Sequence, residues 1–139
     1  MTLFHIQTKV KIPQKAHYKK WIKHIAQREG RRVGELNVIL CSDAYLLDMN
    51  QKYLNHNTYT DIITFDYSED NWLSGDIFIS TDRVQENASM YNVDFQDELK
   101  RVIAHGVLHL CGYKDKTKME KEKMREMENI ALNEFSKMV

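Results

Sequence analysis

Two histidines four residues apart, His105 and His109, lie in the segment HGVLHLCGYKD, which spans residues 105–115. On a helix, such residues are about 40° apart around the axis and one turn apart along it, so both imidazoles can hold one metal ion. Gly112 stands where the helix should end, because a glycine permits the left-handed turn that stops a helix. The chain can then reverse and bring Asp115 toward the histidines. We therefore predict a metal site of His105, His109 and Asp115, with a coordination position open for water.

This segment has the spacing of the zincin signature H-E-x-x-H-x-x-G-x-x-H, with Asp115 as the last ligand. Gly106 stands where that signature has the glutamate that serves as general base in metalloproteases. Its absence leaves the ligands in place and removes the peptidase machinery. Gly106 also lies on an apolar stripe, where it would let another element approach closely. The alternative is a pair of hydrogen-bonded core histidines, but the matching offsets of Gly112 and Asp115 favour a metal.

A strongly amphipathic helix is predicted to carry both histidines. Its apolar residues repeat at intervals of three and four from Leu99 to Leu110, so one face must be buried. Other helices are predicted from apolar stripes and from capping residues such as Ser42, and strands from β-branched and aromatic runs. The predicted strands are 3–10, 35–41, 61–67 and 76–81, with a hairpin loop over 68–75, and the predicted helices are 13–29, 42–53, 82–92, 95–111 and 117–137. This order predicts an α+β fold (α/β layers), a small mixed four-stranded sheet packed with helices, one of them a zincin-like metal helix.

Composition limits the class of protein. With 139 residues and 16.5 kDa, we expect one domain over residues 1–139. No apolar run approaches the roughly 20 residues that span a bilayer, and the lysines of residues 1–20 exclude a secretory signal. We therefore expect no membrane partner. Cys41 and Cys111 form no CxxC pair, so we expect no disulfide scaffold and a cytoplasmic location.

Charge is unevenly distributed along the chain, although the total is zero. A neutral total argues against a general nucleic-acid coat, but not against a basic face that meets phosphates at one place. Lys15, Lys19 and Lys23 could guide an RNA backbone or simply form a solvated surface. The Lys/Glu mixture of the last helix is typical of a solvated face. That helix is expected to bury Met124, Met127, Ala131, Phe135 and Met138.

The segment HGVLHLCGYKD resembles the HGxLHLxGYDH motif of the YbeY family, metal-dependent endoribonucleases of rRNA maturation. Residues 46–67, LLDMNQKYLNHNTYTDIITFDY, and residues 74–80, SGDIFIS, resemble two further segments of that family. The resemblance implies a zincin-like α/β fold, one bound Zn²⁺ or similar divalent ion, and cleavage of single-stranded RNA. It also implies a role in 16S rRNA 3′-end processing and ribosome quality control. The implied partners are rRNA and the ribosome or ribosomal proteins, with no nucleotide cofactor.

Two positions depart from the family pattern. Asp115 stands where the family usually has a third histidine, which lowers the charge of the site and makes it more hospitable to harder ions such as Mn²⁺. Leu54 replaces an arginine that would be a natural partner for phosphate. Lys52 or His56 could substitute for it, although His56 could equally be a surface loop residue.

The predicted metal would polarise a phosphodiester, activate a water, or both. A metal-bound hydroxide and an RNA 2′-hydroxyl both stay open as nucleophile, and no residue is assigned as general base. Alternative interpretations are a non-catalytic ribosome-associated factor with a structural metal, a metallohydrolase on another substrate, and a two-His-one-carboxylate iron oxygenase.

Four further side chains near these motifs could serve the site or the fold. Tyr113 could stack on a base, but packing against the helix end is favoured. Cys111 is interpreted as a core residue. Asp61 and Asp76 begin two strands and are interpreted as capping residues or as partners of a ligand histidine.

Overall fold

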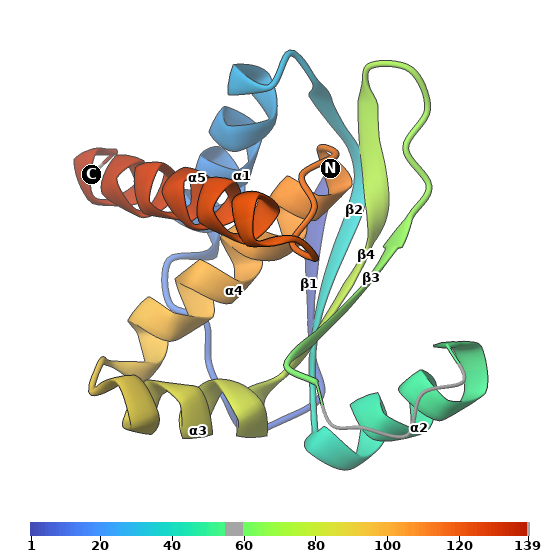
Figure 1. Ribbon diagram of the computed structural model, residues 1–139, viewed down its shortest axis with the longest axis vertical. Coiled ribbons are helices and arrows are strands. Elements are labelled where there is room, and N and C mark those ends of the chain that lie inside the picture. The colour runs from blue at the N-terminus through green and yellow to red at the C-terminus, as the bar shows by residue number, and fades with distance from the viewer. Residues whose placement is uncertain (55–59, 139) are drawn as a thin grey trace.

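The computed structural model describes residues 1–54 and 60–138, and it is built on one mixed four-stranded sheet (Figure 1). The strands are β1 (Thr2–Ile6), β2 (Arg32–Cys41), β3 (Ile62–Asp66) and β4 (Trp72–Ser80). They lie in the order β1-β2-β4-β3, with β1, β2 and β4 parallel and β3 antiparallel to β4. The predicted α+β fold with a small mixed sheet is confirmed.

Five helices pack around this sheet in the described part of the chain. They are α1 (Lys15–Arg28), α2 (Asp43–Leu54), α3 (Thr81–Tyr91), α4 (Phe95–Leu110) and α5 (Lys118–Lys137). In Figure 1, α1, α4 and α5 lie on one side of the sheet and α2 lies on the other. The predicted cap of α2 is confirmed, because the Ser42 hydroxyl accepts a hydrogen bond from the Tyr45 N–H at 3.2 Å.

The main core lies between the sheet and the helices α1, α4 and α5. Ile77 and Ile79 of β4 are fully buried there, while Phe78, which points to the opposite face, packs with α2. The indole N–H of buried Trp21 donates to the Ala131 carbonyl at 2.7 Å, which ties α1 to α5. This core holds α4 against the sheet and α5 against α4.

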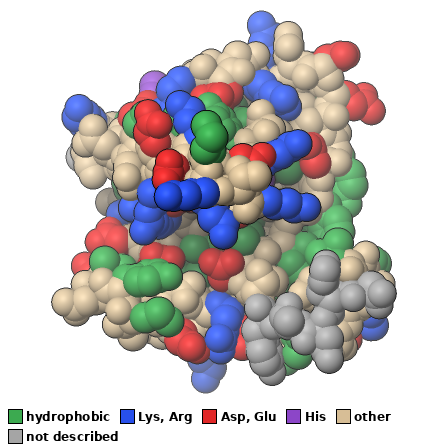
Figure 2. Space-filling view, viewed as in Figure 1, with side chains coloured by type: hydrophobic (Ala, Val, Ile, Leu, Met, Phe, Trp, Pro, Cys, Tyr) green, Lys and Arg blue, Asp and Glu red, His purple; other side chains and the backbone are tan. Residues whose placement is uncertain are grey.

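The charged face of α5 is on the surface, as Figure 2 shows, and most of its predicted apolar stripe is buried. Met124, Met127, Ala131 and Phe135 are buried, and Met138 is partly buried against the same core. No helix in residues 1–54 and 60–138 is long and apolar enough to cross a bilayer.

The hairpin between β3 and β4 is tighter than predicted. The loop expected over 68–75 is wrong, because Glu69 and Trp72 already exchange backbone hydrogen bonds of 3.1 and 2.8 Å. Only two residues, Asp70 and Asn71, lie between them, and Asp70 takes the positive φ of 52° that a short turn requires. Polar residues such as Ser74 therefore lie within β4, where the Ser74 carbonyl accepts from the Tyr67 N–H at 2.9 Å and the Ser74 N–H donates to the Ser68 hydroxyl at 3.1 Å.

The outer strand β1 is shorter than predicted and β2 is longer. β2 ends at Cys41, so residues after Gln7 have no strand with which to pair. At its other end β2 begins at Arg32, which pairs with Trp72 of β4. Strand length is thus set by what the neighbouring strand offers, which local pattern does not contain.

Candidate metal centre

The helix α4 presents His105 and His109 on one side near its C-terminal end. Their ring centroids are 4.5 Å apart, and both side chains are about a quarter exposed. The opposite side of α4 is buried in the core through residues that include Leu99, Ile103 and Val107. The amphipathic pattern of the helix therefore decides which way the histidines face.

Gly106 explains how closely α4 approaches the sheet. A Cβ atom at this position would lie 2.9 Å from Ile62 Cδ1 of β3 and 2.9 Å from Ile77 Cγ2 of β4. Those distances are too short for a side chain, so the predicted close approach is confirmed. The catalytic glutamate of the zincin signature has no room here, which is a packing reason for its absence.

The connection from α4 to α5 is held at both ends. Gly112 ends α4 with a φ of 107°, and the Tyr113 N–H donates back to the Leu108 carbonyl at 3.1 Å. Thr117 and Glu120 then begin α5 with reciprocal side-chain-to-backbone hydrogen bonds. Asp115 lies between these two fixed points, so the position of its backbone is defined.

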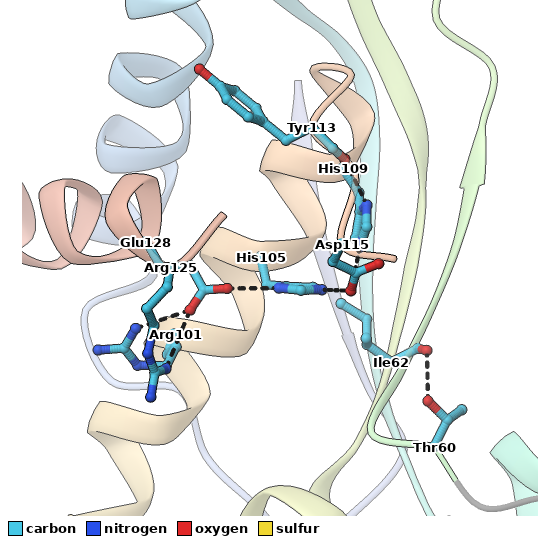
Figure 3. Close-up of polar contacts among 9 residues, drawn as sticks. All are labelled: Thr60, Ile62, Arg101, His105, His109, Tyr113, Asp115, Arg125 and Glu128. Atoms are coloured by element: carbon cyan, nitrogen blue, oxygen red, sulfur yellow. Dashed lines mark hydrogen bonds and ion pairs between the residues drawn. The ribbon is translucent and has the colours of Figure 1, made fainter. Parts of the chain in front are cut away.

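Asp115 turns back onto the two histidines, as Figure 3 shows. Its Oδ2 atom is 3.1 Å from His105 Nε2 and 3.3 Å from His109 Nε2. One donor atom from each residue lies within 4.8 Å of the others, and these three form a group that could hold a metal ion. The structure therefore brings together all three predicted ligands.

The donor atoms fit a metal such as zinc. His109 Nδ1 donates to the Tyr113 carbonyl at 2.9 Å, and His105 Nδ1 donates to Glu128 Oε2 at 2.7 Å. With each Nδ1 carrying a proton, both Nε2 lone pairs of the neutral rings face the Asp115 carboxylate. Zinc bonds of about 2.0–2.1 Å give a tetrahedral edge of about 3.3 Å, close to both measured separations. A bound cation would interact favourably with all three of these acceptors, the two Nε2 atoms and the Asp115 carboxylate.

Glu128 is the site residue that the sequence-based interpretation missed. It lies on α5 and is 5% exposed, and its Oε1 accepts from Arg101 Nη1 at 2.9 Å while Oε2 accepts from His105. The Lys/Glu mixture of α5 was expected to be solvated, and for Glu128 that is wrong. A signal was available, because Glu128 lies four residues after buried Met124 and three before buried Ala131, on the buried stripe.

The contact between Glu128 and His105 shifts the pKa of both groups. Burial acts to raise the pKa of Glu128, but the hydrogen bonds from His105 and Arg101 outweigh burial and lower it. Burial acts to lower the pKa of His105, but Glu128 and the nearby carboxylates of Asp115 and Asp61 outweigh burial and raise it. The pair therefore favours a carboxylate facing an imidazole whose orientation is fixed.

The two strand aspartates have different surroundings. Asp61 lines a hollow that His105 and Asp115 also line, and burial raises the pKa of its carboxyl, with His105 acting in the opposite direction. Asp76 accepts from the Asn37 side-chain amide at 3.0 Å and lies on the other face of the sheet. Of the two, only Asp61 lies near a candidate ligand.

The residues suggested as replacements for the family arginine do not contribute to the described site. Lys52 on α2 pairs with Asp48 at 3.1 Å and lines a hollow beside Phe65 and Phe78, away from the histidines. His56 lies outside the described residues. The cations beside the candidate ligands are instead Arg101 and Arg125, which flank Glu128 (Figure 3).

Tyr113 and Cys111 belong to the packing of the helix end. The Tyr113 hydroxyl donates to Glu29 Oε1 at 2.9 Å, and burial together with that contact raises its pKa to about 12. Cys111 packs against the main core, and burial raises the pKa of its thiol to about 11. The packing interpretation of both residues is confirmed.

The fold and the site define a class of small α+β proteins with a three-residue candidate metal centre at one helix end. The family model for Endoribonuclease YbeY matches residues 3–136. Endoribonuclease YbeY of Christiangramia forsetii is 53% identical over 117 residues, which cover 83% of this chain and 82% of the relative. Endoribonuclease YbeY of Flavobacterium johnsoniae is 46% identical over 135 residues, 97% of each chain. The chain therefore belongs to the endoribonuclease YbeY family, as its motifs predicted.

A solved structure has a similar fold. The solution structure of TM1509 from Thermotoga maritima is 27% identical in sequence and matches with a TM-score of 0.64. The match covers 97% of this chain and 93% of the other. The architecture is therefore shared over almost the whole length of both chains.

Proposed function

We propose that this protein cleaves single-stranded RNA internally, in the processing of the 16S rRNA 3′ end and in ribosome quality control. Its family gives the coarser statement, a metal-dependent endoribonuclease of rRNA maturation. The observation that carries the proposal is the convergence of His105 Nε2, His109 Nε2 and Asp115 Oδ2. Residues 1–139 would act as one cytoplasmic catalytic domain. Its partners would be rRNA and the ribosome or ribosomal proteins, with no nucleotide cofactor.

The proposed cofactor is one Zn²⁺ held by His105, His109 and Asp115, with another divalent ion also compatible with a carboxylate ligand. When bound, the ion would supply positive charge for a scissile phosphate and would acidify a water molecule. The chain itself orients the ligands, because Glu128 holds the His105 ring and the Tyr113 carbonyl holds the His109 ring.

The packing of Gly106 supports RNA rather than peptide as the substrate. The absent glutamate is the general base that peptide hydrolysis by zincins requires, and the contact with Ile62 and Ile77 leaves no space for it. A phosphodiester carries a negative charge that a nearby cation stabilises directly. The site therefore suits phosphodiester cleavage better than peptide cleavage.

The test measures metal content and RNA cleavage on the same preparations of wild type, His109→Ala and His5→Ala. His5 is an exposed histidine on β1 that contacts Asn37, so it is a matched control. We expect about one metal ion per chain and cleavage of a short single-stranded rRNA fragment in wild type and in the control. Both should be lost in His109→Ala. Metal bound without cleavage in wild type would contradict the proposal and favour a non-catalytic ribosome-associated factor. A wild type without metal would return both histidines to a structural role.

A further inference from the structure

Two adjoining hollows lie beside the candidate metal centre. The first, of about 260 Å³, is lined by residues that include His105, Asp115, Arg125 and Tyr91. The second, of about 450 Å³, shares Tyr91 and Arg125 with the first and continues past Val93. We call the two together the α3–α5 groove, because its opposite walls come from the end of α3 and from α5.

The wall of the groove on the α5 side is basic. Figure 2 shows a row of Lys and Arg side chains along α5 and above the hollowed part of the surface. Arg125 of α5 lines the groove itself, and Lys100 and Arg101 line it from α4. Lys114 and Lys116 flank Asp115 in the sequence. On α5, Lys118 and Lys121 lie seven and four residues before Arg125, and so on the same side of the helix. In the described part of the chain, Lys114, Lys116, Lys118 and Lys121 make no ion pair, so their charges are available to an anion.

Arg125 is the cation of this wall that is best placed to bind a ligand. Both carboxylate oxygens of Glu128 already accept closer hydrogen bonds, from His105 at 2.7 Å and from Arg101 at 2.9 Å. Arg125 lies 3.6 Å from Glu128 Oε1, and its side chain is 60% exposed. Arg101 is also held by Asn129 and serves the fold. Arg125 therefore keeps most of its donors free for a phosphate.

The opposite wall is apolar and exposed. Tyr91 at the end of α3 is 58% exposed and lines both hollows, and Met90 and Val93 beside it are 66% and 45% exposed. An exposed aromatic ring facing a basic wall is the arrangement with which proteins bind single-stranded nucleic acid, with bases on the ring and phosphates on the cations.

The carboxylates that line the groove limit where a phosphate can bind. Asp61, Glu98 and Glu128 line the first hollow together with His105 and Asp115, and Asp97 and Glu98 line the second. The carboxylate of Glu128 already accepts from His105 and Arg101, whereas Asp97 and Glu98 on α4 disfavour a phosphate beside them, so the exposed Arg125 on α5 is the favoured position for a phosphate. Asp115 is part of the connection that leads into α5, and it lines the first hollow together with His105 and Arg125.

We propose that single-stranded RNA lies in the α3–α5 groove with its backbone along α5, one phosphate on Arg125 and one base against Tyr91. This inference rests on the proposed function and assigns the path of its substrate. It also supplies a phosphate contact that Leu54, at the position of the family arginine, cannot make.

The test is RNA binding without cleavage, measured by fluorescence anisotropy with a labelled 2′-O-methyl oligonucleotide and zinc-loaded protein. Arg125→Ala is compared with Lys123→Ala, because Lys123 is on the same helix, 55% exposed and paired with Glu126. Tyr91→Ala is compared with Tyr67→Ala, because Tyr67 is 60% exposed and lies outside the groove. Zinc content and melting temperature are measured for every variant.

We expect Arg125→Ala to weaken binding about fivefold to tenfold and to reduce the slope of log K against log salt by about 0.7. Tyr91→Ala should weaken binding about tenfold, and a probe with an abasic position should remove that difference. Both controls should stay within about twofold of wild type. Arg125→Glu provides a second variant, with a larger expected loss because it reverses the charge.

Two results would overturn the inference. If Arg125 and Tyr91 variants bind like their controls while wild type binds and cleaves RNA, the groove is not the path and the proposed function stands. If the Tyr91→Ala loss is the same with the abasic probe, no base lies on that ring. A wild type that neither binds nor cleaves RNA would refute the proposed function itself.

Discussion

Glu128→Gln tests whether the buried carboxylate on α5 controls the affinity of the candidate metal centre. The substitution keeps the volume of the side chain and removes its charge. Glu128 now accepts from two donors, His105 Nδ1 at 2.7 Å and Arg101 Nη1 at 2.9 Å. A glutamine has only one acceptor oxygen, so its amide N–H₂ must face one of these donors. Either His105 or Arg101 therefore loses a hydrogen bond in a partly buried setting.

The expected magnitude follows from this loss. Partners that orient a ligand histidine are worth about 10–100-fold in metal affinity, and a charged hydrogen bond is roughly twice as strong as a neutral one. Since the glutamine can still orient His105 in one of its two amide orientations, we expect about a tenfold weaker zinc affinity, about 1.4 kcal/mol. The loss of this hydrogen bond from a partly buried donor should also lower the free energy of unfolding of the metal-free protein by about 1 kcal/mol.

The assay is zinc affinity by competition with a chromophoric chelator, with urea unfolding of the metal-free protein alongside. Glu126→Gln is the matched control, because Glu126 lies on the same helix, is 61% exposed and pairs only with Lys123 among the described residues. We expect the control to match wild type in both measurements. An unchanged zinc affinity in Glu128→Gln would refute the idea that Glu128 orients His105 for metal binding.

Three further predictions concern packing, thiol reactivity and pH. Gly106→Ala should lower the free energy of unfolding by about 1–2 kcal/mol, since the clash with Ile77 outweighs the helix propensity gained, and urea denaturation checks this. A stability equal to wild type would show that α4 can move away from the sheet. Cys111 should react slowly with iodoacetamide at pH 8 until the protein is unfolded, since its thiol has a pKa of about 11, and rapid labelling of the folded protein would contradict that burial.

The pH prediction follows from the raised pKa of His105. The protonated ring stabilises the metal-free protein below its usual pKa of 6.5, and that contribution is lost as pH rises through the higher folded value. Zinc must displace the proton on His105 Nε2. As the pH is lowered, the zinc affinity should therefore start to decrease at a pH higher than 6.5. In Glu128→Gln this fall should begin at lower pH, which calorimetric titrations across pH 5.5–8 would detect; identical profiles would contradict the contact.

Much of the site was predictable because its residues are close in sequence. His105, His109, Gly112 and Asp115 lie within one helix and the turn after it, so helical geometry and the conformational freedom of glycine place them. The protein family could be inferred from the same segment of sequence. Whether a segment is a helix or a strand was also predictable, because the spacing of its apolar residues marks the buried face, as in the apolar stripe of α4.

The strand ends and the hairpin could not be predicted in the same way. Polar Ser74 was predicted to be in a loop, yet it lies inside β4, because its neighbours Leu73 and Gly75 pair with Val33 and Leu36 of β2. β1 ends at Ile6 because its partner β2 ends at Cys41, where the chain continues into α2. Such boundaries depend on a partner that is distant in sequence, and local propensity does not contain that partner.

The sequence by itself determined the candidate ligands, the class of fold and the family, because each rests on local spacing or on a continuous motif. Only the tertiary structure decided that Glu128 of α5 faces His105, 23 residues away, and that Arg125 and Tyr91 face each other across a groove. Those contacts arise where α3, α4 and α5 pack together. The packing depends on the shapes of three helices at once, and no single stretch of sequence specifies it.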